Sequence, residues 1–212
     1  MSLDGYIDDT SDQRLILSNE ADFDRVDELR ASCDATLIGA NTIRRDNPRL
    51  LVNSEERRRD RVARGMAPYP IKITVTRGNL QSEWKFFNTG GEKIIYCPGV
   101  AADELREKLG GRATVVGLGA QSVDIELMLA DLRQRGIDRL MVEGGSSIHT
   151  EFLTRGLAHE LQIAIAPFFV GEDSAPRFVN SGMFRQNSTN RMTLAEVRQI
   201  GDIVFARYLT KR

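Results

Sequence analysis

The stretch "RLMVEGGSSIHTEFL" (139–153) carries the clearest structural pattern in this 212-residue chain. A short apolar run ends at Glu143, two glycines follow, and a helical pattern begins at once near Ser146. Glycines at such a turn let a phosphate approach the backbone, and the N–H groups at a helix start point at an anion. The stretch therefore predicts either an anion-binding turn between a strand and a helix, or a plain tight turn whose serine caps the helix.

Apolar runs and helical patterns alternate on both sides of this stretch. We expect strands at residues 2–7, 35–40, 71–76, 93–97, 113–117, 139–142, 160–166, 193–200 and 203–209. Strands that alternate with helices favour βαβ units and a largely parallel sheet covered on both faces. The short turn at Gly201–Asp202 is typical of a hairpin. The prediction is an α/β fold of three layers (αβα), with a mixed, mostly parallel central sheet and a C-terminal antiparallel hairpin.

Periodicity predicts four helices. The first follows Asn19 as N-cap and has an apolar face formed by Phe23, Val26, Leu29 and Cys33. The second spans residues 101–109, the third follows a capping aspartate at position 124, and the fourth runs from residue 146 to a glycine at 156. Residues 53–69 are crowded with charge and have no apolar stripe. They predict a mobile surface loop or a frayed polar helix, with a lid over an anionic ligand as the alternative.

Composition excludes several classes of protein. The formal net charge is −1, so the chain lacks the excess of basic residues that is typical of proteins binding nucleic acid or an anionic membrane. Cys33 and Cys97 form no CxxC pair, and the two histidines lack a metal-ligand spacing, so no metal site is expected. The apolar run "LQIAIAPFFV" (161–170) is too short to span a membrane. With no signal-peptide pattern, we expect one cytoplasmic domain over residues 1–212.

Two further turns could bind a ligand. "VVGLGAQSVD" (115–124) matches GxG without the third glycine of a dinucleotide fingerprint, so it is weak alone. In "LIGANTIRRDNPRLL" (37–51), Thr42 and Asp46 share one face of a helical turn after a strand. The sequence contains no GxSxG elbow and no Walker lysine. Phosphate-binding turns without an evident nucleophile favour chemistry supplied by a cofactor, such as hydride transfer.

Taken in order, four blocks resemble the reductase domain of bacterial riboflavin biosynthesis. They are "SLDGYI" (2–7), "LIGANTIRRDNPRL" (37–50), "PIKITVT" (70–76), and "MVEGGSSIHTEFL" with "HELQIAIAPFFVG" (141–171). The resemblance implies a dihydrofolate-reductase-like fold and a homodimer. It also implies NADPH-dependent reduction of 5-amino-6-(5-phosphoribosylamino)uracil, from ribose to ribityl.

The resemblance also implies site residues. Cofactor contacts are expected from Thr42, Asp46, Gly144, Gly145, Ser146, Ser147, Ile148 and His149. Substrate contacts are expected from Gln13, Arg30, Leu50 and Glu143. The chain departs from the family at Asn53, where an arginine usually serves the substrate phosphate. Either Arg57, Arg58 or Arg59 replaces that arginine, or the substrate differs. The chain also departs at Arg77, where serine is common. Arg77 could bind the 2′-phosphate of NADPH or be an ordinary turn residue. No proton donor is identified, so water is expected to supply the proton.

Three alternatives stay open. The first is a reductase of the same fold that acts on dihydrofolate or on a pyrimidine of specialised metabolism, which Asn53 keeps possible. The second is a non-catalytic nucleotide-binding protein. The third is a methyltransferase that uses "VVGLG" for adenosylmethionine, and it lacks the acidic ribose ligand after a glycine-rich first strand.

Overall fold

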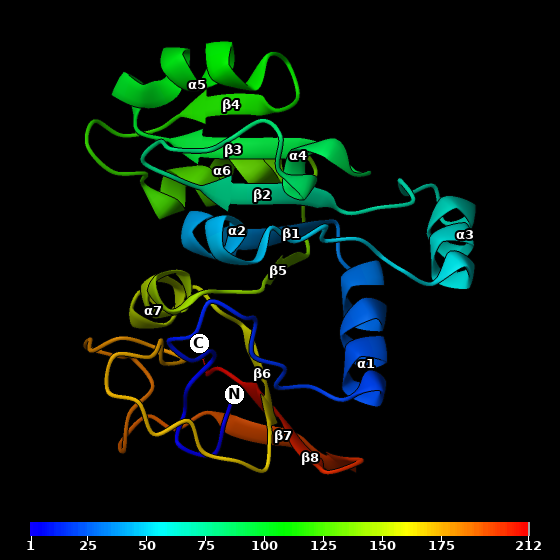
Figure 1. Cartoon of the computed structure of the whole chain (residues 1–212), viewed down its shortest axis with the longest axis vertical. Helices are drawn as coiled ribbons and strands as arrows, with labels where there is room; N and C mark the ends of the chain where they lie inside the picture. Colours follow the sequence, from blue (N-terminus) through cyan, green and yellow to red (C-terminus); the bar gives the residue numbers. More distant parts are fainter. Residues whose placement is uncertain (212) are drawn as a thin grey trace. The chain divides into compact units, whose positions relative to one another are not determined.

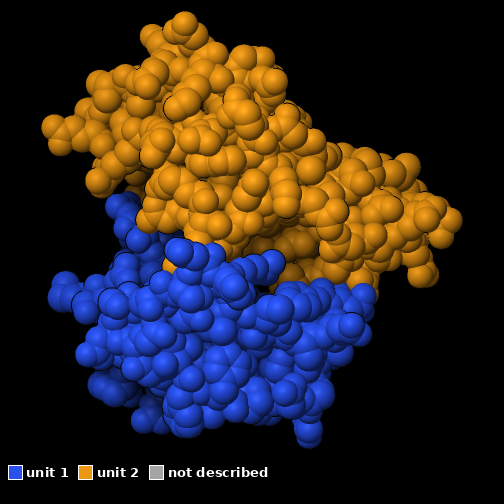
Figure 2. All heavy atoms as spheres, viewed as in Figure 1, with its two compact units in different colours: residues 1–25, 145–212 blue, residues 26–144 orange. Residues whose placement is uncertain are grey.

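The computed structural model describes residues 1–211 and divides the chain into two compact units. Unit 1 consists of Met1–Arg25 together with the chain from Gly145 onward, and unit 2 is Val26–Gly144 (Figure 2). Across the described residues, no helix has the length and apolar character needed to cross a membrane. A single reductase domain over residues 1–212 stays a prediction.

Unit 2 contains a five-stranded sheet in the order β4-β3-β2-β1-β5 (Figure 1). Its strands are β1 (Ala35–Gly39), β2 (Ile71–Val75), β3 (Lys93–Cys97), β4 (Thr114–Gly117) and β5 (Leu140–Val142). Every neighbouring pair is parallel. The carboxyl ends of all five strands therefore lie at one edge of the sheet, which is where open α/β sheets bind ligands.

Helices connect these strands. They are α2 (Ala40–Asp46), α3 (Glu55–Ala63), α4 (Lys85–Asn88), α5 (Ala102–Leu109) after the 3₁₀ turn η1 (Gly99–Ala101), and α6 (Ile125–Gln134). Helix α1 (Glu20–Ala31) begins in unit 1 and ends in unit 2.

Both faces of the parallel sheet are covered. Ile38, Ile95 and Cys97 pack in one apolar cluster with buried side chains of α2, α4 and α5. Tyr96 points to the opposite face, because side chains alternate along a strand, and its hydroxyl donates a 2.5 Å hydrogen bond to Asp131 of α6. The sheet is thus the middle layer of the predicted αβα arrangement.

Unit 1 holds helix α7 (Ser146–Thr154) and a second, separate sheet in the order β6-β8-β7. Its strands are β6 (Glu160–Ile165), β7 (Thr193–Ile200) and β8 (Ile203–Leu209), and both pairings are antiparallel. The predicted fold class and terminal hairpin are confirmed. In detail, the hairpin belongs to this separate sheet and not to the edge of the parallel one.

The predicted strand at residues 2–7 is wrong. The Ser2 amide donates to the Tyr6 carbonyl at 2.8 Å, and the Tyr6 amide donates to Ser2 Oγ at 3.0 Å. Gly5 between them has φ +86°. These residues therefore form a tight turn, and only Tyr6 makes a strand-like bridge, to Arg177.

The charged stretch at residues 53–69 is also more ordered than a mobile loop. Ser54 caps α3 by accepting a hydrogen bond from the Arg57 amide at 3.2 Å. Arg61, within α3, is almost fully buried. Its guanidinium donates to the carbonyls of Ala31 and Cys33 at 2.8 and 2.7 Å. The helix is thereby fixed to the end of α1.

Candidate active site

Glu143 follows β5 at the carboxyl edge of the parallel sheet. Its amide donates to the Leu37 carbonyl of the neighbouring β1 at 2.9 Å. One residue on, the Gly144 carbonyl accepts from the Gly39 amide at 2.6 Å. These two bonds extend the β1–β5 pairing past the end of β5, so the backbone from which the Glu143 side chain leaves is fixed.

Arg30, near the end of α1, forms a two-pronged ion pair with Glu143. Its Nε and Nη2 each donate to one carboxylate oxygen at 2.8 Å, and its Nη1 donates to the Leu51 carbonyl at 2.8 Å. The side chains are 13% and 15% exposed. Burial lowers the pKa of Arg30, but the Glu143 carboxylate outweighs it, so the pKa is raised and the guanidinium stays charged. The structure therefore brings together two of the predicted substrate residues.

Leu50 precedes the carbonyl that Arg30 binds and has an unusual backbone. Its φ is +47°, in the left-handed region that non-glycine residues seldom adopt, and Asn47 nearby has φ +42°. The Leu50 side chain is buried in the main cluster of unit 2. Its side chain points into the core, so a ligand contact from this position would come from the backbone.

Asp27 lies one helical turn before Arg30 on α1 and is buried. Its carboxylate accepts hydrogen bonds from the Asn53 and Ser54 amides, the second at 3.2 Å, and from Arg57 Nη1 at 3.1 Å. Asn53 is the position where the resembled family has an arginine. Here it takes part in the site region through its backbone.

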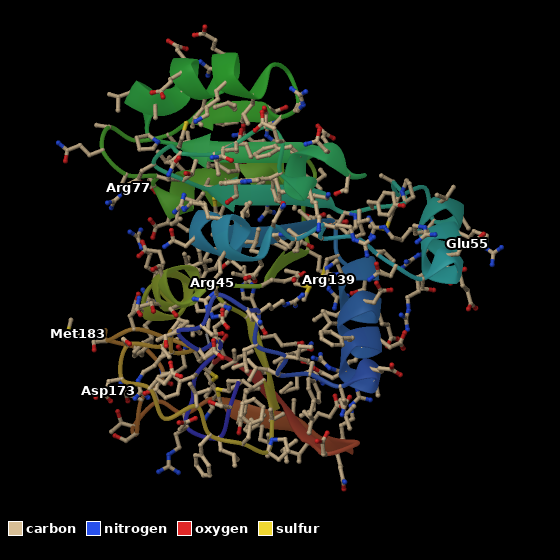
Figure 3. The ribbon with its side chains drawn as sticks, viewed as in Figure 1. Arg45, Glu55, Arg77, Arg139, Asp173 and Met183 are labelled. Carbon is tan, nitrogen blue, oxygen red and sulfur yellow. The ribbon has the colours of Figure 1, made fainter. Side chains whose placement is uncertain are left out.

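The predicted cofactor residues of unit 2 follow strands β1 and β2 of the parallel sheet. Thr42 and Asp46 are half-buried on α2, which begins directly after β1. Arg77 is exposed in the turn that follows β2, and Figure 3 shows its side chain on the outside of that turn. Strands β1 and β2 pair as far as Gly39 and Val75, so α2 and this turn begin at neighbouring strand ends.

The first turn of α7 contains the predicted cofactor residues of unit 1. Gly145 is the N-cap, and no side chain within residues 1–211 caps the helix. Gly144 before it has φ +112°, a conformation that L-residues rarely adopt. Ser146 Oγ donates to the Arg177 carbonyl, and Ser147 is exposed. A helix start without a side-chain cap, preceded by two glycines, suits an anion at its N-terminus.

His149, also in this turn, is held by Phe178. Its Nδ1 lies 3.1 Å from the Phe178 carbonyl oxygen, and the two rings are 4.8 Å apart. A carbonyl only accepts hydrogen bonds, so Nδ1 carries the proton in the neutral ring. Burial lowers the pKa of His149, against the opposing effect of this hydrogen bond. The structure thus gives His149 a neutral ring and a structural partner.

The "SLDG" block orders unit 1 around Asp4. The Asp4 carboxylate accepts from the Val170 and Gly171 amides at 3.1 and 2.8 Å. It also accepts from Ser2 Oγ at 2.5 Å. This block therefore connects the N-terminal turn to the chain after β6. Gln13, the remaining predicted substrate residue, is exposed in a segment without helix or strand.

Sequence reasoning missed Asp27 and Asp4. The one pattern that could have found Asp27 is its spacing, since residues three apart share a helix face and Arg30 was already a candidate. No local pattern indicates that Asp4 binds two amides far along the chain, because those partners are brought close only by folding.

Three comparisons bear on the identity of this arrangement. Residues 1–205 match the family described as the RibD C-terminal domain. Curated relatives include proteins named 2,5-diamino-6-ribosylamino-4(3H)-pyrimidinone 5′-phosphate reductase. The relative in Methanothermobacter thermautotrophicus is 33% identical, covering 100% of this chain and 95% of its own. The one in Archaeoglobus fulgidus is 30% identical, covering 95% and 90%. Among solved structures, a pyrimidine reductase-like protein of Corynebacterium diphtheriae has a TM-score of 0.80 at 20% identity, covering 100% of this chain and 89% of its own.

Proposed function

Because the chain belongs to the RibD C-terminal domain family, we propose that it is a reductase of riboflavin synthesis. Its substrate is a ribosylaminopyrimidine 5′-phosphate, whose ribose is reduced to a ribityl chain. The observation that carries this proposal is Glu143, held by Arg30 at the carboxyl edge of the parallel sheet. A fixed carboxylate at that edge can accept hydrogen bonds from the hydroxyl groups of a sugar.

Two pyrimidines fit this description, the 5-amino uracil compound and the 2,5-diamino pyrimidinone. Relatives named for the diamino compound are 30% to 33% identical to this chain. Relatives named riboflavin biosynthesis protein RibD in bacteria, such as that of Bacillus amyloliquefaciens, are 26% to 28% identical. We therefore favour the 2,5-diamino pyrimidinone phosphate as the better substrate and keep the uracil compound as the second.

A reductase of this family uses a nicotinamide cofactor, and we propose NADPH. The first turn of α7 fits a diphosphate, because its N-cap is Gly145 and no described side chain caps it. Ser146, Ser147, Ile148 and His149 belong to that turn. In unit 2, Thr42 and Asp46 of α2 stay predictions from the sequence as cofactor contacts, and so does the exposed Arg77 as a contact of a 2′-phosphate.

In the proposed mechanism a bound nicotinamide would be the source of hydride for the sugar, and the side chains of the protein orient the substrate. The two-pronged contact with Arg30 fixes the direction of the Glu143 carboxylate. That carboxylate orients the sugar by accepting hydrogen bonds from its hydroxyl groups, since correct placement is most of what hydride transfer requires. No described side chain is assigned as the proton donor, and water supplies the proton.

The test is a fluorescence titration with NADPH and NADH, followed by NADPH-oxidation assays. The expected result is tighter binding of NADPH and turnover of the 2,5-diamino pyrimidinone phosphate, with slower turnover of the uracil compound and none of dihydrofolate. Turnover of dihydrofolate alone would contradict the substrate assignment. Tight binding of NADPH without turnover of any pyrimidine would favour a non-catalytic protein.

The diphosphate assignment has its own test in Gly144→Ala. Because φ at Gly144 is +112°, a side chain strains the turn before α7, by about 1–3 kcal/mol. The free variant relieves this strain by moving the turn, and binding must reverse that movement, so we expect the Kd for NADPH to rise on the order of tenfold. The matched control is Gly136→Ala, where φ is +79° and a Cβ meets no atom within 4 Å. It should lower stability by a similar amount and leave the Kd unchanged; a similar Kd change in both variants would refute the assignment.

We also propose a homodimer formed through the sheet of unit 1. Residues paired across its strands share a face, and one face carries Leu161, Ile163, Ile165, Leu194, Val197, Gln199, Val204, Ala206 and Tyr208. That face has no charged residue, and Val197 and Val204 are 58% and 49% exposed. A face without charge suits a second copy of itself across a two-fold axis. A cytoplasmic location stays a prediction from the sequence.

A further inference from the structure

We propose that Asp27 is a positioning residue for the substrate, which sets the path of the segment from Leu50 to Ser54. This inference rests on the proposed function, since it concerns the same substrate. Asp27 is buried on α1, and its carboxylate accepts three hydrogen bonds. Two of the three donors are backbone amides of this segment, so Asp27 acts on the main chain and not only on another side chain.

The segment itself is held in a conformation that the chain seldom adopts alone. Leu50 has φ +47° and Asn47 has φ +42°. Non-glycine residues in the left-handed region cost of order 1–3 kcal/mol each and persist where surrounding contacts fix them. Val52, between Leu50 and the amides that Asp27 binds, is fully buried. External contacts are therefore needed to hold this path.

Helix α1 provides those contacts at two points. Arg30 donates to the Leu51 carbonyl at 2.8 Å, and Asp27 accepts from the Asn53 and Ser54 amides. Asp27 and Arg30 are three residues apart, so they lie on the same helix face. One face of α1 thus binds the segment on both sides of Val52.

The same helix face also binds Glu143. Arg30 joins the Leu51 carbonyl to the Glu143 carboxylate through one guanidinium group. A shift of the segment at Asn53 would therefore be transmitted through Leu51 to the group that orients the sugar. Misplacement by about an ångström can cost on the order of 10²-fold in rate, so a residue that touches no substrate can still control binding.

A simpler explanation for the buried carboxylate of Asp27 is its ion pair with Arg57, which would fix α3 and have no effect on the substrate. The experiment must distinguish this role from the positioning role. Arg57 Nη1 lies 3.1 Å from Asp27, and its side chain is 23% exposed. If Asp27 served only to fix α3, loss of Arg57 would have the same effect as loss of Asp27. If Asp27 positions the segment, the two backbone amides keep most of its effect when Arg57 is removed.

The experiment compares Asp27→Asn and Arg57→Gln with the wild-type chain, using the pyrimidine phosphate and NADPH. Asparagine keeps the shape but replaces one acceptor oxygen by a donor, so one backbone amide loses its partner. We expect Asp27→Asn to raise KM for the pyrimidine on the order of tenfold, with the Kd for NADPH unchanged. Arg57→Gln should change KM less than threefold, as for a partly exposed pair. Glu28→Gln, an exposed acid on the same helix, is the matched control and should change neither.

Hydrogen exchange supplies a second measurement that does not require turnover. The Asn53 and Ser54 amides should exchange faster in Asp27→Asn, and at the wild-type rate in Glu28→Gln. Faster exchange with an unchanged KM would overturn the proposal and leave Asp27 a structural residue. Equal KM changes in Asp27→Asn and Arg57→Gln would overturn it in favour of the ion pair. If the wild-type chain reduced neither pyrimidine, the proposed function would fail. Unchanged exchange of these amides in Asp27→Asn would independently refute the claim that Asp27 fixes the segment.

Discussion

Arg30 donates hydrogen bonds to both carboxylate oxygens of Glu143 and to the Leu51 carbonyl. Replacing either oxygen of Glu143 therefore disturbs Arg30 as well. In Glu143→Gln, an amide NH₂ faces the Arg30 guanidinium where a carboxylate oxygen accepted a 2.8 Å hydrogen bond. A donor against a donor turns the side chain away or displaces Arg30. We expect kcat/KM for the pyrimidine to fall by on the order of 10- to 100-fold, the effect of misplacing an orienting group. The Kd for NADPH, measured by fluorescence, should change less than twofold.

The control for this substitution is Glu55→Gln. Glu55 lies on α3, where Figure 3 shows its side chain pointing outward, and its ion pair with Arg59 has both side chains more than 70% exposed. Exposed pairs contribute little, so this variant should match the wild type in both measurements. Equal loss of turnover and of NADPH affinity in Glu143→Gln would contradict the assignment of Glu143 to the substrate.

Lys72 gives the molecule a pH dependence of stability. It is fully buried on β2, and Nζ donates to the Thr89 hydroxyl at 2.7 Å and to the Phe86 carbonyl at 3.4 Å. Burial, with smaller effects of Lys93 and Arg30, lowers the pKa of Lys72 from 10.5 to about 7. Between these pH values the unfolded chain binds more protons at this group than the folded chain does. The contribution of Lys72 to the free energy of unfolding therefore rises with pH from about 7 to about 10.

Urea unfolding of the wild type and of Lys72→Met at pH 7, 8 and 9 tests this sign. Methionine fills similar space without a titrating group. The wild type should gain free energy of unfolding relative to the variant as pH rises, by up to about 1.4 kcal/mol per pH unit. Parallel pH profiles for the two proteins would show that Lys72 keeps its ordinary pKa in the folded chain.

At the scale of elements, the strands were predictable and one helix face was not. Strands β3, β7 and β8 have the bounds that alternating and β-branched runs predict, because such a pattern is local to each strand. The predicted apolar face of the first helix is confirmed only in part, since Cys33 is buried but Phe23 is not. Phe23 is 44% exposed, whereas the acids Asp22 and Asp27 are buried.

Asp22 accepts hydrogen bonds from its near neighbours Ser18 and Arg25, whereas the partners of Asp27 come from elsewhere in the chain. Asp27 is satisfied by the Asn53 and Ser54 amides, which no periodicity within α1 indicates. Burial of a carboxylate is unfavourable unless donors meet it, so the helix orientation depends on contacts that exist only after folding. In the candidate site, too, local patterns were predictable and contacts between distant residues were not. The glycine turn before α7 was visible in the sequence, and the pairing of Arg30 with Glu143 was not.

Helix α3 depends on Arg61 in the same way. Its guanidinium donates to the carbonyls of Ala31, Cys33 and Ala67, at 2.7 to 2.8 Å. Arg61→Met would leave these acceptors without their donor, and we expect the free energy of unfolding to fall by about 2–4 kcal/mol, since each buried unsatisfied group costs about 1–3 kcal/mol. Chemical denaturation measures this. Arg59→Met, at an exposed position of the same helix, should change stability by less than about 0.5 kcal/mol. Equal stabilities would mean that α3 is not fixed by Arg61.

At the scale of the whole molecule, the family was predictable from motifs spread along the chain. The proposed homodimer depends on a surface that forms only when strands pair. The four blocks include "SLDGYI" in unit 1 and "PIKITVT" in unit 2, and the family match spans residues 1–205. The apolar face of the unit 1 sheet has no motif of its own. It follows from the pairing of β8 with both neighbours, which places Val204 beside Ile165 and Gln199.

The double variant Val197→Lys with Val204→Lys tests the homodimer. Both side chains lie on the uncharged face and are about half exposed, so lysine there is tolerated in a monomer. Across a two-fold interface each new charge would be buried together with its copy, at a cost of several kcal/mol. Analytical ultracentrifugation should show a dimer for the wild type and a monomer for this variant. Arg198→Glu with Arg207→Glu changes charge on the opposite face, where Arg198 lies over the Phe205 ring, and should leave the dimer intact. A wild type that sediments as a monomer, or a lysine variant that stays dimeric, would remove this sheet face as the interface.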